Sequence, residues 1–137
     1  MSQITSVTKV VPSIVPTIGT AGAQTNIAID GSGYDRVRHI ITIGAITSSG
    51  TITCKVTESA GSTGSYTDVT SAALATIADT GGSSIYTIDC PISGTKPFQK
   101  LVLTTVTQAG ANSACAELYN GSRTNPNSAP ATQAIIV

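Results

Sequence analysis

The side chains with which this chain could do catalytic or metal chemistry are one histidine, seven carboxylates and three cysteines. His39 lies within an alternating apolar stretch and shares a face with Val37 and Ile41. That position is typical of a core histidine with one ring nitrogen hydrogen-bonded. A Ser-His-Asp triad would also need a nucleophile motif such as Gly-x-Ser-x-Gly, which is missing, although the many serines leave an irregular triad open. The sequence therefore predicts no enzyme activity and no catalytic residue.

The cysteines and carboxylates have no metal-ligand spacing. Cys54, Cys90 and Cys115 are far apart and form no Cys-x-x-Cys pair, so each is expected to be a small buried hydrophobe, with one disulfide between two of them left open. No calcium loop occurs, and Glu58 and Asp68 are expected near Lys55 as surface ion pairs. We expect no metal and no cofactor.

The composition excludes two classes of partner. Seven Lys+Arg balance seven Asp+Glu, and only 10% of residues are charged. Binding to nucleic acid or to an anionic membrane needs a dense basic patch, which this chain lacks. The sequence has no apolar run of about 18 residues and no signal-peptide pattern at its start. We therefore expect synthesis in a cytoplasm and no membrane partner.

Period-two alternation and Gly/Ser-rich breaks run through the chain, and they predict strands rather than helices. In the clearest strand, residues 51–58, Ile52, Cys54 and Val56 point one way and the intervening residues point the other way. The other expected strands are 25–30, 36–46, 66–69, 85–90, 98–107 and 113–119. One short helix is expected at residues 71–78, with Leu74 and Ile77 as its apolar contacts. The predicted fold is all-β, an antiparallel β-sandwich or small barrel of seven to eight strands.

The two ends are expected to be extended arms around a domain at residues 24–122. Residues 1–23 contain two Val-Pro steps, and proline cannot donate to the middle of a sheet. Residues 123–137 end in three aliphatic residues. The aliphatic residues of both arms are candidate intermolecular contacts: Ile4, Val7, Val10, Val11, Ile14, Val15, Ile18, Ile135, Ile136 and Val137. The alternative is that the N-terminal arm folds back as an edge strand of its own sandwich.

Three segments carry a likeness to a known class of proteins. They are residues 33–46 (GYDRVRHIITIGAI), 50–69 (GTITCKVTES, continuing to GSYTDV) and 94–103 (GTKPFQKLVL), the last followed by an Ala-rich strand that closes on 120–126 (NGSRTNP). In this order they resemble the head decoration, or capsid cement, proteins of tailed bacteriophages. The pattern often has Lys-Arg-Tyr-Val-Arg in the third segment, where this chain has Pro97, Phe98 and Lys100.

The resemblance implies a β-sandwich without enzyme activity that binds the major capsid protein and stabilises the shell. It also implies a homo-oligomer, a dimer or trimer at local symmetry axes, on the outer surface of the virion. The alternative is another phage or surface β-module, such as a fibre, tail or glycan-binding domain, and a small hydrolase is a more distant one. A glycan site would need exposed aromatic platforms, for which the chain offers only four Tyr and one Phe.

Overall fold

The computed structural model describes residues 8–18, 21–24, 26–107, 111–120 and 131–136, without the side chains of 17, 18 and 131–136. These residues form eleven strands and one short 3-10 helix, η1 (Asp79–Gly81). The strands are β1 (Thr8–Ile18), β2 (Gly22–Ala23), β3 (Ile29–Asp30), β4 (Arg36–Ile43), β5 (Thr51–Ser59), β6 (Thr67–Ala73), β7 (Ile77–Ala78), β8 (Ser84–Pro91), β9 (Phe98–Val106), β10 (Ala111–Tyr119) and β11 (Ala131–Ile136). No helix in this part of the chain is long and apolar enough to cross a membrane.

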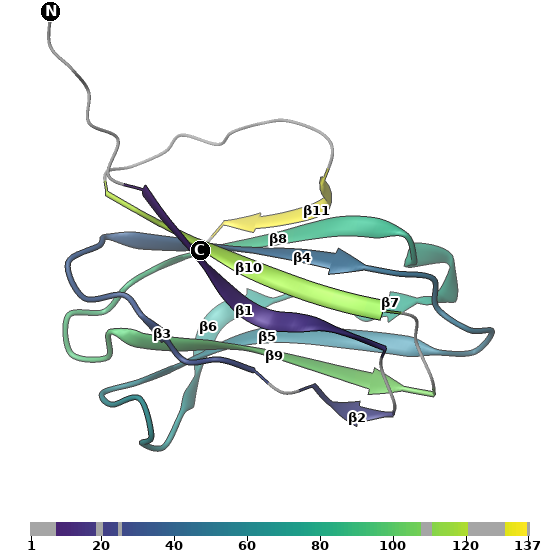
Figure 1. Ribbon diagram of the computed structural model, residues 1–137, viewed down its shortest axis with the longest axis horizontal. Helices are drawn as coiled ribbons and strands as arrows, with labels where there is room; N and C mark the ends of the chain where they lie inside the picture. Colours follow the sequence, from purple (N-terminus) through teal and green to yellow (C-terminus); the bar gives the residue numbers. More distant parts are fainter. Residues whose placement is uncertain (1–7, 19–20, 25, 108–110, 121–130, 137) are drawn as a thin grey trace, which may run out of the picture.

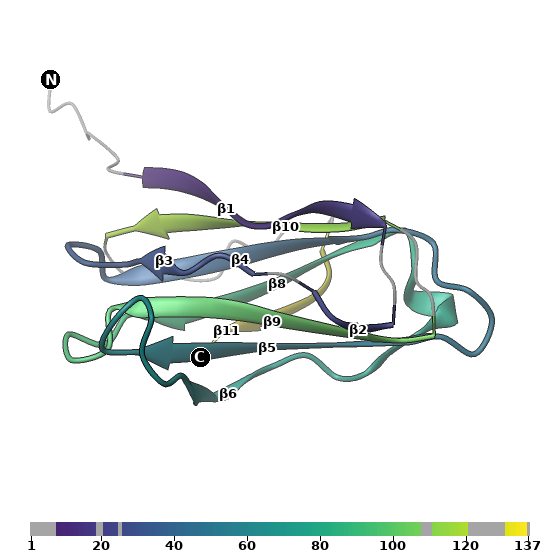
Figure 2. The same ribbon diagram turned by 60° about the horizontal axis from the view of Figure 1, so that its bottom comes forward.

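The strands make two layers, which Figures 1 and 2 show from two sides. The five-stranded sheet has the order β1-β10-β4-β8-β11. The six-stranded sheet has the order β2-β9-β5-β6, with β3 also on β9 and β7 on β5. Every pair is antiparallel except β11 with β8, which is parallel. The expected all-β sandwich is therefore confirmed, with more strands than the expected seven to eight.

The core lies between the inward faces of the two sheets. The strand β4 alternates strictly, with Val37, His39, Ile41 and Ile43 buried, as its sequence predicts. From the other sheet, β5 and β9 contribute a matching aliphatic face, consisting of Ile52, Val56, Leu101 and Leu103 together with Cys54. Because the side chains of a strand alternate between its two faces, one apolar stripe per strand suffices to fill this layer.

The prediction of a short helix at residues 71–78 is wrong. The strand β6 continues to Ala73, and β7 follows at Ile77–Ala78, so this stretch lies along β5 instead. The Leu74 amide donates to the Cys54 carbonyl at 3.0 Å. Ser71, at φ 63°, lies where the β5–β6 register shifts, and a left-handed residue there interrupts the ladder as a bulge does. Leu74 and Ile77 are buried by this sheet rather than by a helix.

The strand expected at residues 25–30 is shorter than predicted. Only Ile29 and Asp30 pair with β9, so β3 is a two-residue strand. Ile29 is 3% exposed whereas Ile27 is 37% exposed, so these two residues do not share a buried face. The backbone of Ile27 instead donates to the Ser13 carbonyl at 2.9 Å, which ties this segment to β1 in the opposite sheet.

The prediction of an extended N-terminal arm is wrong for residues 8–18. They form β1 and pair with β10 at the edge of the chain's own sheet. This is the alternative that the Val-Pro steps allowed, since Pro12 and Pro16 lie in an edge strand. Ile14 is 1% exposed and Val11 packs against the core, so neither is a free intermolecular contact. Val10 and Val15 remain 66% and 56% exposed.

The other predicted contacts of the two arms are only partly described. The backbone of Ile135 and Ile136 pairs with β8, opposite Ile88 and Asp89, so this end of the chain adds an edge strand as well. The side chain of Ile18 lies outside the description, as do those of Ile135 and Ile136. Ile4, Val7 and Val137 lie outside the described residues altogether.

Two truncations in β9 test the core. Leu103 is fully buried and Val106, on the same strand, is 56% exposed. We expect Leu103→Ala to lower the free energy of unfolding by about 2–5 kcal/mol, because it removes buried carbons and leaves a cavity. The matched control Val106→Ala should change it by less than about 0.5 kcal/mol. Urea denaturation measures both, and equal losses would contradict this placement of the core.

Candidate functional site

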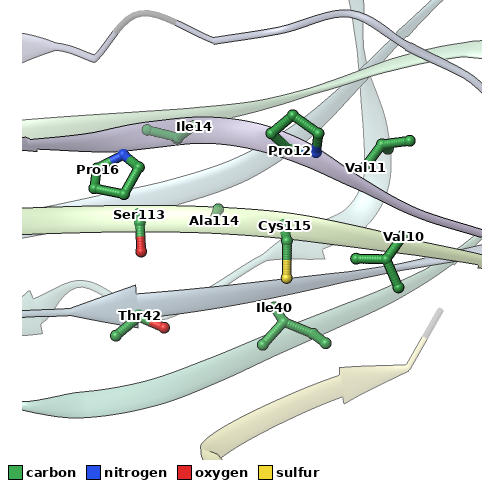
Figure 3. Close-up of a pocket in the computed structure, with 10 residues that line it drawn as sticks. All are labelled: Val10, Val11, Pro12, Ile14, Pro16, Ile40, Thr42, Ser113, Ala114 and Cys115. Carbon is green, nitrogen blue, oxygen red and sulfur yellow. The ribbon is translucent and has the colours of Figure 1, made fainter.

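An open apolar groove runs over the outer face of the five-stranded sheet (Figure 3). Its volume is about 340 Å³, and its walls come from β1, β10 and β4. None of its lining residues carries a charge: Val10, Val11, Pro12, Ile14, Pro16, Ile40, Thr42, Ser113, Ala114 and Cys115. The β1–β10 register shifts between Pro12 and Ile14 and again between Ile14 and Thr17, so β1 is not regularly paired along the groove.

The exposed large hydrophobic side chains lie mostly on or beside β1, the edge strand of the five-stranded sheet. Among the described residues they are Val10, Val15, Ile27 and Val106. Val10 and Val15 belong to β1, Ile27 is tied to β1 through its backbone, and Val106 ends β9, the neighbour of β2. We call Val10, Val15 and Ile27 the apolar edge, and Val106, at the end of β9 in the other sheet, is not part of it. Single exposed aliphatic residues are ordinary, whereas several close together form an apolar patch of the kind found at binding surfaces.

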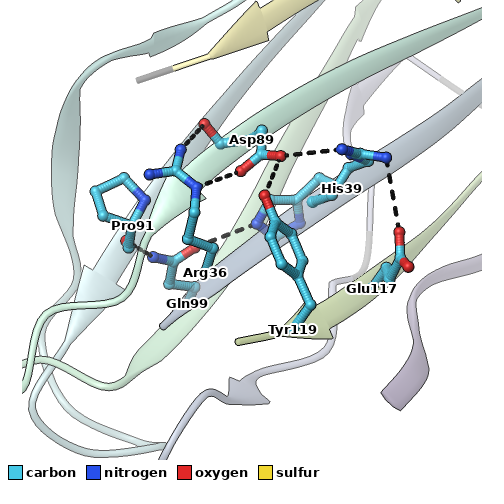
Figure 4. A network of polar contacts seen from close by, with 8 residues as sticks. Arg36, His39, Asp89, Pro91, Gln99, Glu117 and Tyr119 are labelled. Carbon is cyan, nitrogen blue, oxygen red and sulfur yellow. Dashed lines mark hydrogen bonds and ion pairs between the residues drawn. The ribbon is translucent and has the colours of Figure 1, made fainter. Parts of the chain in front are cut away.

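Next to the groove, a buried carboxylate joins three strands of the same sheet (Figure 4). Asp89 on β8 is 5% exposed and accepts hydrogen bonds from Arg36 Nε at 2.9 Å and Arg38 at 3.3 Å, both on β4. It also accepts a short hydrogen bond from the Tyr119 hydroxyl on β10. Arg38 extends the network to Glu117 at 3.8 Å and lies over the Tyr119 ring. With two guanidinium groups and a phenol as donors, Asp89 is a cross-strand link rather than a base with a free lone pair facing solvent.

His39 makes a second polar link, between the sheets. Gln99 on β9 donates its side-chain amide to the Pro91 carbonyl at 3.0 Å, so its oxygen faces His39 Nε2 at 3.3 Å (Figure 4). That oxygen can only accept, and Nε2 therefore carries the proton. Nδ1 is the unprotonated nitrogen and has no hydrogen-bond partner in the buried core. The expectation of a buried histidine with one satisfied nitrogen is confirmed.

Burial sets the protonation of the remaining candidate groups. It lowers the pKa of His39 to about 4, against weaker opposing effects of Gln99 and Asp89. It raises the pKa of the Cys54 and Cys90 thiols to about 12. The Cys115 pKa is also raised, mainly by burial. All three thiols are free, and no group of three metal-binding side chains occurs within the described ranges.

The outer face of the six-stranded sheet carries the surface ion pairs. Lys55 contacts Asp68 at 2.9 Å, as expected, but Glu58 pairs with Lys96 at 3.4 Å rather than with Lys55. Lys100 lies over the Tyr66 ring at 4.3 Å. Exposed pairs of this kind contribute about 0–1 kcal/mol each and do not define a site.

The groove and the Asp89 network were not among the sequence-predicted sites. A signal for the network was present, because Arg36 and Arg38 are spaced to share one face of a strand and Asp89 lies inside an apolar strand. A signal for the groove was not, since its walls come from three strands that are distant in the sequence. No protein-family model matches the chain, and no curated protein matches its sequence.

Removing the Asp89 charge tests the network. Asp89→Asn keeps the shape but leaves two largely buried guanidinium groups without this counter-charge, and we expect a loss of about 3 kcal/mol in the free energy of unfolding. The control Asp68→Asn removes the carboxylate of an exposed pair with Lys55 and should cost about 0–1 kcal/mol. Urea denaturation at pH 7 compares them, and a similar small loss in both would show that Asp89 does not hold the strands together.

The buried His39 predicts a pH dependence of stability. Its pKa falls from 6.5 to about 4 on folding, so between these values the unfolded state binds more protons. The contribution of neutral His39 to the free energy of unfolding is therefore complete above pH 6.5 and is lost as the pH falls toward 4. From pH 7 to 4.5 we expect the wild type to lose about 2–3 kcal/mol more than His39→Gln, which has no ring to protonate. Parallel pH profiles of unfolding for the two proteins would refute the assignment.

Proposed function

We propose that this protein is a virion structural protein, a decoration or cement protein that binds the major capsid protein shell of a tailed bacteriophage and stabilises it. The observation that carries the proposal is the apolar edge, formed by Val10, Val15 and Ile27, on a chain with no net charge. Such a surface favours association with another protein through aliphatic contacts. The likeness of residues 33–46, 50–69 and 94–103 to decoration proteins supplies the class of partner.

The polar groups support a binding role over a catalytic one. The single histidine lies in the core at 0% exposure, and the Asp89 carboxylate is held by its own arginines and tyrosine. General acid-base catalysis needs a titratable group within hydrogen-bond reach of a substrate. Neither group has that access.

The tyrosines favour a protein surface over a glycan as the partner. Tyr86 and Tyr119 are 4% and 2% exposed, and Tyr34 packs against the core. Tyr66 is half-buried beneath Lys100. A sugar-binding platform needs an aromatic face open to solvent. The apolar edge offers aliphatic side chains instead, which suit a protein partner.

Shell binding tests the proposal. The protein is produced with the cognate major capsid protein, and its binding to purified shells is measured by co-sedimentation. We expect the double variant Val10→Ser/Val15→Ser to weaken binding at least tenfold, because each substitution loses an aliphatic contact worth about 1 kcal/mol or more. The control Thr70→Ser, on β6 at the opposite edge of the sandwich, should bind as the wild type does.

Salt distinguishes the apolar contact from an ionic one. Raising NaCl to about 1 M should change the dissociation constant less than tenfold, because ionic strength screens exposed charges and leaves apolar contacts in place. A protein that never sediments with shells would refute the proposal. A steep loss of affinity with increasing salt would show that basic side chains, rather than the apolar edge, make the contact.

A further inference from the structure

We propose that the outer face of the five-stranded sheet packs against the same face of a second copy of this chain, with the groove at the centre of the contact. The two copies are related by a two-fold axis that lies between the faces and runs across the strands. The inference concerns contact between copies and does not depend on binding to a shell. Val15 and Ile27 of the apolar edge do not line the groove and are not part of the proposed contact.

The charged residues of this sheet are confined to one end of it. The strands β1, β10, β4 and β8 carry five residues that are charged at pH 7, which are Lys9, Glu117, Arg36, Arg38 and Asp89. The registers place all five in three adjacent cross-strand rows, at the end where β10 and β8 finish. From the row of Cys115 and Ile40 to the other end, these four strands carry no charged side chain.

This distribution of charge suits a two-fold contact. A two-fold axis brings each residue that lies on it against the same residue of the other copy. A charge at the centre would therefore meet a like charge, whereas Thr42 and Ser113 meet their counterparts without repulsion. An axis across the strands also turns the charged end of each copy toward the uncharged end of the other. The charges then lie at the rim, where water solvates them, and the same face of a second copy is electrostatically matched to this one.

The centre of the contact combines apolar and hydroxyl groups. Cys115 and Ile40 are directly opposite each other in the β10–β4 register, and Ser113 and Thr42 form the next outward-facing pair (Figure 3). The aliphatic and sulfur groups gain from removal of their surface from water. The two hydroxyls can each donate and accept a hydrogen bond between copies. No charged group of the groove has to lose its hydration.

The face is large enough for a weak but specific contact. The four strands are 8 to 11 residues long. With about 4.8 Å between strands and about 3.3 Å per residue, they present roughly 500 Å² per copy. Two copies then bury about 1,000 Å² in total, which is at the lower end of the range for specific interfaces. We therefore expect pairs that form at high protein concentration.

The edge strand favours this contact over an extension of the sheet past β1. Pro12 and Pro16 have no N–H, so β1 cannot offer an uninterrupted row of donors to an added strand. The register shifts on either side of Ile14 break the regular pairing further. A second copy at this side of the sandwich is therefore held by side chains of the outer face.

Complementary charges at Thr42 test the proposal on the isolated protein. Thr42 is exposed on β4 and lines the groove. Thr42→Lys and Thr42→Glu each place like charges together near the axis, and we expect each variant alone to associate at least tenfold more weakly than the wild type. An equimolar mixture of the two should recover association, because opposite charges then face each other across the contact. Recovery in the mixture would also show that both variants are folded.

Sedimentation equilibrium measures these associations. For the wild type we expect a mass approaching twice the 13.8 kDa of one chain at about 500 µM, as suits an interface of this size. The matched control Thr53→Lys, at an exposed threonine on β5 of the other sheet, should associate as the wild type does. A monomeric wild type, a Thr42→Lys variant that associates normally, or a mixture that stays monomeric would overturn the proposal. A monomeric wild type whose binding to shells is lost with Thr42→Lys would assign this face to the shell instead.

Chemical cross-linking places the contact on the face, because the native Cys115 lines the groove. Sheets packed face to face lie about 10 Å apart, so a short bismaleimide can join the Cys115 thiols of two copies. We expect linked pairs that disappear with Cys115→Ser and with Thr42→Lys but persist with Thr53→Lys. Cys54 and Cys90 are 2% and 0% exposed and should not contribute. A Cys115 that reacts with a monofunctional maleimide and yet gives no linked pairs would contradict the placement.

Discussion

Packing of two aliphatic sheet faces against each other is the interaction on which the rest of this structure depends. Among the residues that the structure describes, each sheet buries its inward stripe against the other sheet. The central strands β4, β5 and β9 supply fully buried residues such as Ile41, Ile52 and Leu103. The edge strand β1 takes part through Ile14, which is why residues expected as an arm belong to the sandwich. The outer faces are left free to differ in chemistry.

Two polar links make this packing specific. The His39–Gln99 contact joins β4 to β9 across the core, so a slip of either strand by one residue would leave a buried ring nitrogen or amide without its partner. The Asp89 network joins β4, β8 and β10 within one sheet and fixes their register on the outer face. Both links bury a titratable group, His39 in one and Asp89 in the other.

The outer faces of the two sheets differ in their charged and apolar side chains, a difference that the overall composition does not show. The six-stranded sheet carries exposed ion pairs such as Lys55 with Asp68. The β1 side of the five-stranded sheet carries an uncharged groove and the apolar edge. Val10 belongs to both the groove and the apolar edge, so these two features form one continuous uncharged surface along β1.

The sequence by itself determined the fold class and most of the core, because period-two alternation is a local property of each strand. The buried faces of β4 and β5, and the burial of His39, follow from that pattern. It misjudged residues 71–78, where a short apolar spacing compatible with a helix is overridden by pairing with β5. It also left open whether residues 8–18 form an arm or an edge strand, since proline allows both. Only the tertiary structure decided that β1 pairs with β10, that Asp89 meets Arg36, Arg38 and Tyr119, and that three separate strands enclose a groove. Those features depend on which strands become neighbours, and pairing between segments many residues apart leaves no periodic trace in the chain.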